Sequence, residues 1–301
     1  MSQHVQDRID WRERFLAERR TGIGGSDIAA IVGIDPRRDA LDVWRRFAGL
    51  EEDDLSDVAA IRRGSRLEVA VLDEYEDIQG VALVRNPPLA RANGAPHRLA
   101  HADALIFDEV TRGVEAKTAA GAAADDFGAN GTDEVPRRYV LQCQWYMGVY
   151  GAPSWDVAAM LSGHFRFEFR FYRIHRNDRL IGLLNAHADR FWERHVVTGV
   201  APEPSNAASA ARHAMALYPS DVEPLLSTDD HAIAERLRAW KAARNAKDAA
   251  VKADEEHANA FRALIGPAAG IEVPGIGRVT WKTNKAGARP LRPTWIEEDP
   301  E

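Results

Sequence analysis

Hydrophobic and polar side chains alternate most regularly between residues 164 and 174. Phenylalanines at 165, 167, 169 and 171 are separated by Arg166, Glu168 and Arg170, so on an extended chain all the rings share one face. This alternation predicts a half-buried strand over 164–174. The apolar segment 154–161 predicts another strand just before it.

Apolar side chains spaced three and four residues apart predict helices elsewhere in the chain. The expected helical ranges are 10–20, 28–32, 39–48, 56–79, 136–150, 177–197 and 227–265. Ser26 or Asp27 is expected to cap the second helix, Asp39 the third, and Ser227 the last. Glu68 lies close to the apolar stripe of the helix at 56–79. It is therefore either a surface residue at the edge of that stripe or a group that points into a site.

A β-hairpin is predicted over residues 97–117, with a polar turn that ends at Gly113. Asp103 is expected on its first arm, and Glu115 and Lys117 on its second, two residues apart and therefore on one face. A divalent metal site that activates water can be built from these groups: the two carboxylates bind the cation, and the ammonium positions or stabilises the hydroxide. The alternative is an ordinary ion pair on a solvated strand face.

The lysine in this hairpin is unusual for its position in the chain. The protein has 39 Lys and Arg residues, yet Lys117 is the only lysine before Lys241. A chain that otherwise uses arginine and places lysine here favours a role for a compact ammonium rather than a planar guanidinium.

Two further groups of residues are candidates for binding. Arg19 and Arg20 precede a glycine-rich loop and Ser26, so backbone N–H groups, a helix dipole and guanidinium groups could bind an anion there. A plain tight turn is the alternative. Three residues of the helix at 136–150 lie on one face at helical spacing, namely Tyr139, Gln142 and Tyr146. That face is either part of a site or aromatic core packing beside a surface glutamine.

The composition sets the broad class. Apolar residues make up 45% of the chain and charged residues 28%, which is typical of a globular protein. The lone Cys143 excludes an internal disulfide, and the N-terminus is unlike a signal peptide. We therefore expect a cytoplasmic location and no membrane association. The net charge of −7 argues against indiscriminate coating of nucleic acid but allows a local basic groove, since twelve arginines lie in the first 66 residues.

We expect an α/β core over residues 1–205, a linker rich in Pro, Ala and Ser over 206–226, and a helical arm with a β-hairpin over 227–301. The arm has apolar residues at coiled-coil spacing, but its midpoints Arg244, Lys247 and Asp254 are polar. This pattern indicates a helical arm rather than a strong coiled coil.

Four segments in order carry a family resemblance: RRTGIGGSDIAAIVG, RRGSRLEVAVLDEYE, HADALIF with GVEAK, and VPRRYVLQCQWYMGVYG. Over residues 10–200 the chain resembles the YqaJ-like viral recombinase family. These are phage-type alkaline exonucleases similar to lambda exonuclease, in the PD-(D/E)xK nuclease superfamily. The resemblance implies a mixed sheet flanked by helices in a restriction-endonuclease-like core.

The resemblance also assigns roles to residues. It implies that Asp103, Glu115 and the carbonyl of Ala116 hold metal with support from Glu68, and that Lys117 stabilises the attacking hydroxide. It places Gln142 in the family's glutamine motif with Gln144 beside it, and Tyr146 in a related motif. It places Arg19 and Ser26 at the 5′-phosphate, with Arg20 adjacent. The sequence departs from the family in having Ala102 where proline usually precedes the aspartate and Ala104 where glycine is common.

The implied activity is Mg²⁺-dependent degradation of double-stranded DNA ends from 5′ to 3′, which leaves 3′ single strands; Mn²⁺ is expected to substitute. A ring-shaped trimer is implied by analogy, as are a phage or prophage origin in a bacterial host and a single-strand annealing protein as partner. The alternatives are an endonuclease or a 3′-directed or single-strand exonuclease of the same superfamily, and a non-catalytic subunit that binds DNA ends.

Overall fold

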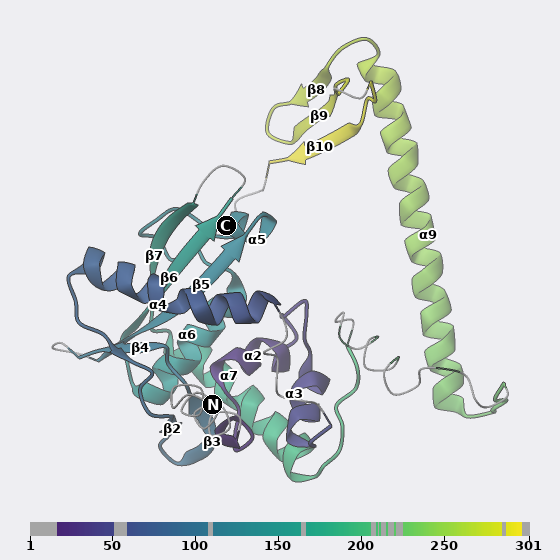
Figure 1. Cartoon of the computed structure of the whole chain (residues 1–301). Coiled ribbons are helices and arrows are strands. Elements are labelled where there is room, and N and C mark those ends of the chain that lie inside the picture. The colour runs from purple at the N-terminus through teal and green to yellow at the C-terminus, as the bar shows by residue number, and fades with distance from the viewer. Residues whose placement is uncertain are drawn as a thin grey trace. The chain divides into compact units, whose positions relative to one another are not determined.

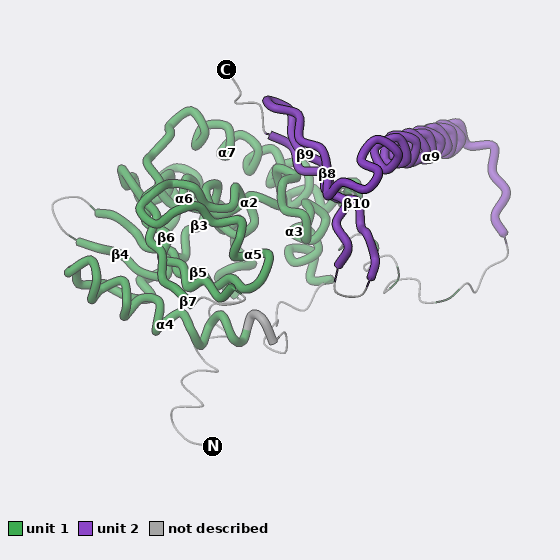
Figure 2. The backbone as a smooth tube through the Cα atoms, turned by 90° about the horizontal axis from the view of Figure 1, so that it is seen from above, with its two compact units in different colours: residues 1–220 green, residues 221–301 purple. Residues whose placement is uncertain are grey.

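A computed structural model describes residues 17–50, 59–107, 111–163, 167–205, 225–284 and 287–296, with residues 209, 211, 215 and 220 between them. The chain divides into two compact units, Met1–Ser220 and Asp221–Glu301 (Figure 2). Of the helix expected at 10–20, residues 17–19 are helical, residue 20 is in a turn, and residues 10–16 lie outside the described residues.

The first unit is built on a five-stranded mixed sheet of order β1-β4-β5-β6-β7. Its strands are β1 Val84–Arg85, β4 Ala104–Ile106, β5 Arg112–Ala120, β6 Ser154–Ser162 and β7 Phe167–His175. Neighbours pair antiparallel except β5 and β6, which are parallel and joined through α5 Ala122–Asp125 and α6 Arg137–Tyr150. The expected mixed sheet flanked by helices is confirmed.

Helices cover both faces of this sheet (Figure 1). On one face, Val71, Leu72 and Tyr75 of α4 (Ala59–Gln79) pack with Ala158 and Met160 of β6. On the other, Val157, Ala159 and Leu161 of the same strand pack with residues of α6. Alternate residues of β6 thus enter two cores, which is why neither face of the strand is exposed to solvent.

Smaller elements complete the first unit. They are α2 Gly25–Ile31, α3 Ala40–Phe47, α7 Asp178–Phe191, η1 Trp192–Val197, and the paired strands β2 Ala90–Ala92 and β3 Ala95–Ala100. Asp39 caps α3 as expected, because its side chain accepts the N–H of Asp42. The expected cap of α2 is wrong: Gly24 is the N-cap, and Asp27 accepts the Gly24 N–H from the third helical position.

The hairpin that carries the candidate acids is shorter than expected. Its paired strands are β4 and β5, and Asp103 lies in the bend just before β4 rather than on the first arm. The side chain of Asp103 accepts the Ala116 N–H at 2.8 Å, so the residue is still fixed against the second strand.

The second unit consists of α9 His231–Ile265 and an antiparallel sheet of order β10-β9-β8. Asp230 caps the helix in place of the expected Ser227. The expected hairpin, β8 Gly270–Val273 and β9 Gly277–Trp281, gains a third strand, β10 Leu291–Trp295. Arg289 fixes this addition: its guanidinium stacks 3.8 Å from the Trp281 ring centroid and donates to the carbonyls of Gly266, Ala268 and Trp281. No described helix is long and apolar enough to cross a membrane.

Candidate active site

Glu115 is the buried centre of the candidate site. It lies in the middle of β5 with only 3% of its surface exposed. Its Oε1 accepts hydrogen bonds from Gln142 Nε2, at 2.6 Å, and from Lys117 Nζ. Its Oε2 is buried and has no hydrogen-bond partner among the described residues. A buried carboxylate oxygen without a partner is costly, so this atom is the strongest sign that a cation belongs here.

Asp103 and Glu68 bring two more carboxylates to the same place. Asp103 is held by the Ala116 N–H, and its pKa is raised by burial. Glu68 belongs to α4. It lines a cavity of about 190 Å³ together with Gly64, Ala116, Lys117 and Thr118. The structure therefore favours the interpretation that Glu68 points into a site.

Electrostatics shows how closely these groups interact. Burial and the charge of Asp103 raise the pKa of Glu68 to about 7 and the pKa of Glu115 to about 8. Burial would lower the pKa of Lys117, but the carboxylates of Glu115 and Asp103 outweigh it and raise that pKa. Lys117 therefore stays charged, and the closely spaced carboxylates around it retain protons. A divalent cation that binds there would displace these protons.

The donors present fit a hard divalent cation. Mg²⁺ prefers oxygen ligands, and the site offers the carboxylates of Glu115 and Asp103 and the carbonyl of Ala116. Glu68 is near enough to Asp103 for their charges to interact. Within the described ranges, no group of three or more Asp, Glu, His or Cys side chains is placed so that it could hold a metal ion by itself. Main-chain oxygen and water ligands would complete the shell, as is usual for Mg²⁺.

Helix α6 supplies the wall above Glu115. Gln142 bridges Glu115 and the Tyr146 hydroxyl, which lies 3.1 Å from its Nε2. Tyr139, one turn earlier, presents its ring 4.9 Å from Lys117 Nζ. The expected face of Tyr139, Gln142 and Tyr146 is therefore turned to the carboxylates rather than only to the core.

The structure does not bring Gln144 to this group. Its Nε2 donates to the His175 carbonyl at 2.7 Å, and its Oε1 accepts the Asn177 N–H at 2.9 Å. Residues two apart on a helix point in different directions, which explains why Gln142 and Gln144 have separate partners. Gln144 connects the end of β7 to the start of α7.

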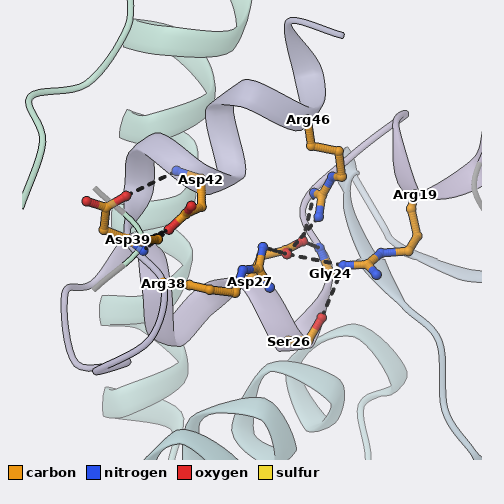
Figure 3. Close-up of polar contacts among 9 residues, drawn as sticks. Arg19, Gly24, Ser26, Asp27, Arg38, Asp39, Asp42 and Arg46 are labelled. Carbon is orange, nitrogen blue, oxygen red and sulfur yellow. Dashed lines mark hydrogen bonds and ion pairs between the residues drawn. The ribbon is translucent and has the colours of Figure 1, made fainter. Parts of the chain in front are cut away.

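The N-terminus of α2 carries a cluster of arginines around Asp27 (Figure 3). Arg46 binds Asp27 through two hydrogen bonds of 2.8 Å, while Arg19 and Arg38 approach the same carboxylate at 3.4 and 3.5 Å. Burial would raise the pKa of Asp27, but the charges of Arg46, Arg19 and Arg38 outweigh it and hold that pKa well below its usual range.

The expected anion-binding residues lie at the edge of this cluster. Arg19 Nη2 lies 3.4 Å from Ser26 Oγ, so the two are brought together, and Arg20 is exposed beside them. The roles of Asp27, Arg38 and Arg46 were not predicted from the sequence. The signal was present, because Asp27 lies two residues after Gly25 and is followed by two arginine pairs, but pairing across 19 residues needs the fold.

Gly25 joins the arginine cluster to the carboxylates. A Cβ atom at this position would lie 2.5 Å from Tyr146 Cε1 and 3.1 Å from Gln142 Cγ. Only glycine allows the first turn of α2 to rest on the two α6 side chains that reach Glu115. The arginine cluster and the carboxylates are therefore neighbours, separated by the side chains of Gln142 and Tyr146.

A known protein family and a known protein resemble this chain. The family model of the YqaJ-like viral recombinase domain matches residues 14–153. The uncharacterized protein YqaJ of Bacillus subtilis (strain 168) is 30% identical over 209 residues, which are 69% of this chain and 63% of that protein. The chain thus spans less than two thirds of the length of that relative.

Two solved structures match this chain in part. An alkaline exonuclease (LHK-Exo) from Laribacter hongkongensis has a TM-score of 0.47 at 17% identity, with 68% of this chain and all of that chain covered. A phage related exonuclease from Haemophilus somnus 129PT has a TM-score of 0.40 at 15% identity, with 60% and 96% covered. The family match, residues 14–153, contains every residue of the carboxylate group and of the arginine cluster.

Proposed function

We propose that this chain, whose residues 14–153 match the YqaJ-like viral recombinase domain family, is a divalent-metal-dependent deoxyribonuclease that shortens duplex DNA from the 5′ end and leaves a 3′ single strand. One observation carries the proposal: Glu115 has a buried oxygen without a partner, and its other oxygen is held by Lys117 and Gln142. A buried charge group of this kind fits a catalytic centre better than a structural ion pair.

Asp103, Glu115 and the Ala116 carbonyl would hold Mg²⁺, or Mn²⁺ in its place, with Glu68 supporting the ion or its waters. The ion would supply charge neutralisation at the scissile phosphate and acidify water. Lys117 remains charged at neutral pH, so its ammonium stabilises the hydroxide that attacks the phosphorus. Gln142 orients the Glu115 carboxylate, and Tyr146 holds Gln142 in turn.

Arg19 and Ser26, with Arg20 beside them, would bind the terminal 5′-phosphate. The support is their convergence at the start of α2 and the contact of Gly25 with the wall of the catalytic group. Guanidinium groups suit phosphate because they donate two hydrogen bonds in one plane. Asp27 keeps part of this positive charge ordered before DNA arrives. Tyr139 lies beside Lys117, where its ring would contact the substrate strand.

The test is digestion of a linear duplex in Mg²⁺, with each strand labelled separately at its 5′ and 3′ ends. Progressive loss from the 5′ end by the wild type, abolished in Lys117→Ala and unchanged in the exposed-lysine control Lys252→Ala, supports the proposal. Cleavage of a circular substrate would instead indicate an endonuclease, and loss from the 3′ end an exonuclease of opposite polarity. Binding of DNA ends without cleavage in Mg²⁺ or Mn²⁺ would indicate a non-catalytic subunit.

In a cell, such an activity would act in the cytoplasm of a bacterial host and prepare 3′ strands for recombination. A phage single-strand annealing protein is the natural recipient of these strands, and residues 227–301 are the candidate contact. Co-purification that is lost when residues 227–301 are deleted would support this partner, and undiminished binding by the shortened protein would refute it.

A further inference from the structure

Helix α9 leaves most of its apolar side chains without cover. Of its 35 residues, only Ile265 at the C-terminal end is buried. Ile233, Leu237 and Trp240 are 54%, 61% and 62% exposed, and together with Ala243 they line an apolar groove along the helix surface. An apolar stripe on a helix about 52 Å long normally packs against another element.

The stripe follows a heptad register through the whole helix. One set of core positions, called a here, is Leu237, Arg244, Val251, Ala258 and Ile265. The other set, called d, is Ile233, Trp240, Lys247, Asp254 and Phe261. The ends of the stripe are apolar and its middle is charged, so the charged positions determine which partner fits.

We propose that α9 pairs antiparallel with α9 of a second copy of this chain, centred at residue 249. In that register each a residue faces a d residue of the other helix. Leu237 then lies opposite Phe261, Trp240 opposite Ala258, and Lys247 opposite Val251. The decisive layer places Arg244 opposite Asp254, so two of the three charged core residues pair with each other, and they do so twice across the dimer.

The flanking positions agree with the same register. Antiparallel helices bring the residues that follow each d position together, and here Lys241 lies opposite Glu255. On the other flank Ala250 lies opposite its own copy, and Ala243 lies opposite His257, so small side chains allow close approach. Asp248 meets its own copy, which is the one like-charge contact in this arrangement.

A parallel pair does not fit. It would place Arg244 on Arg244, Lys247 on Lys247 and Asp254 on Asp254, and like charges in core layers are destabilising. The buried C-terminal end of the stripe limits the length over which the two helices can pair. Ile265 is only 2% exposed because it packs in its own unit, so the pair extends from Leu237 to Phe261.

Charge reversal in the full-length protein tests the register. Arg244→Asp and Asp254→Arg each replace two attractive layers by two repulsive ones. We expect each single variant to raise the dimer dissociation constant roughly 30-fold in sedimentation equilibrium. The double variant, with both charges exchanged, should return to near the wild-type value. A 1:1 mixture of the two single variants should form heterodimers, because each supplies the charge that the other lacks.

Several results would overturn the proposal. They are an unchanged mass in both single variants, failure of the double variant to recover, or absence of heterodimers in the mixture. The comparison is made between variants, so an additional contact between cores adds the same mass to each. Both residues lie on the exposed surface of α9, and circular dichroism of each variant checks that the helix is retained.

Discussion

Gln142 donates its amide to Glu115 Oε1 at 2.6 Å, while Glu115 Oε2 has no partner in the described part of the chain. The two oxygens of one buried carboxylate therefore have different tasks. One is oriented by the protein, and the other is available to a cation. This relationship determines what substitutions at either residue are expected to do.

Gln142→Ala should weaken metal binding without abolishing catalysis. Loss of a hydrogen bond that orients a metal ligand typically costs roughly 10- to 100-fold in metal affinity or activity. We therefore expect the Mg²⁺ concentration for half-maximal cleavage to rise, with most of the activity recovered at high Mg²⁺. A matched control is Gln144→Ala, whose side chain contacts His175 and Asn177 instead and should leave the Mg²⁺ requirement unchanged.

Stability without metal should fall as the pH rises. The pKa of Glu115 is raised to about 8 and that of Glu68 to about 7, against an ordinary value of 4.5 in the unfolded chain. The folded protein therefore binds more protons than the unfolded chain, and stability is lost between about pH 4.5 and 8. Thermal melts in EDTA across this range should show the decline, and Mg²⁺ should reverse it at the alkaline end. Glu115→Gln should flatten the profile; the same slope in that variant would contradict the assignment.

The same protons compete with the metal, so cleavage should be weak below pH 7 and strongest in alkaline solution. At fixed Mg²⁺, a plot of initial rate against pH should rise through the range of these two pKa values. Raising the Mg²⁺ concentration should move the rise to lower pH. If the pH profile did not shift with the Mg²⁺ concentration, the titrating group would not be a metal ligand.

Arg19 and Arg46 both contact Asp27 but should respond differently to mutation. Arg46 is buried, so Arg46→Met leaves the Asp27 carboxylate short of its principal partner and should destabilise the protein by about 3 kcal/mol in urea unfolding. Removing the carboxylate as well, in Arg46→Met with Asp27→Asn, should recover part of this loss.

Arg19→Ala should change substrate choice more than stability. We expect it to reduce the preference for 5′-phosphate over 5′-hydroxyl ends about tenfold, because one charged hydrogen-bond donor is lost. Arg37→Ala removes a more exposed guanidinium that pairs with Asp35 and is the control. Equal loss of rate on both kinds of end would place Arg19 outside the end-binding site.

Gly25→Ala should disturb the contact between α2, which carries the arginine cluster, and the α6 side chains that reach Glu115. Its Cβ would lie 2.5 Å from Tyr146 Cε1, so α2 or Tyr146 must shift, at a cost of about 1–3 kcal/mol. Gly182→Ala is the matched control: it lies inside α7 with open space at its Cβ, and should stabilise the protein by up to about 1 kcal/mol. Thermal melting of both variants measures the contrast, and cleavage should fall only in Gly25→Ala.

The elements with strong periodicity could be predicted from the sequence, and those that depend on distant partners could not. α4, α6 and the strands β6 and β7 follow their apolar spacing closely. β10 was missed because Pro293 argues against a strand, yet it lies on the sheet edge, where the missing N–H is tolerated. Asp103 was placed on a strand because its neighbours are apolar, whereas its bond to the Ala116 N–H holds it in a bend.

In the candidate site, too, contacts between near neighbours in sequence could be predicted, and contacts between distant residues could not. Glu115 and Lys117 share a face because strand geometry requires it, so their pairing could be expected from spacing alone. The link from Gln142 to Glu115 depends on how α6 crosses β5, and the Asp27 cluster depends on how α2 meets α3. Neither crossing is encoded in local spacing.

The placement of lysines gives the first unit a built-in chemical reporter. Across residues 1–240, Lys117 is the only side-chain amine, and it is 18% exposed and held as an ammonium by Glu115. Amine-selective reagents act on the neutral form, so acylation of this residue is slow while the carboxylates hold its proton. The modification rate at a single peptide, read by mass spectrometry, thus becomes a measure of how the charges around Glu115 change when a cation or a DNA end is bound.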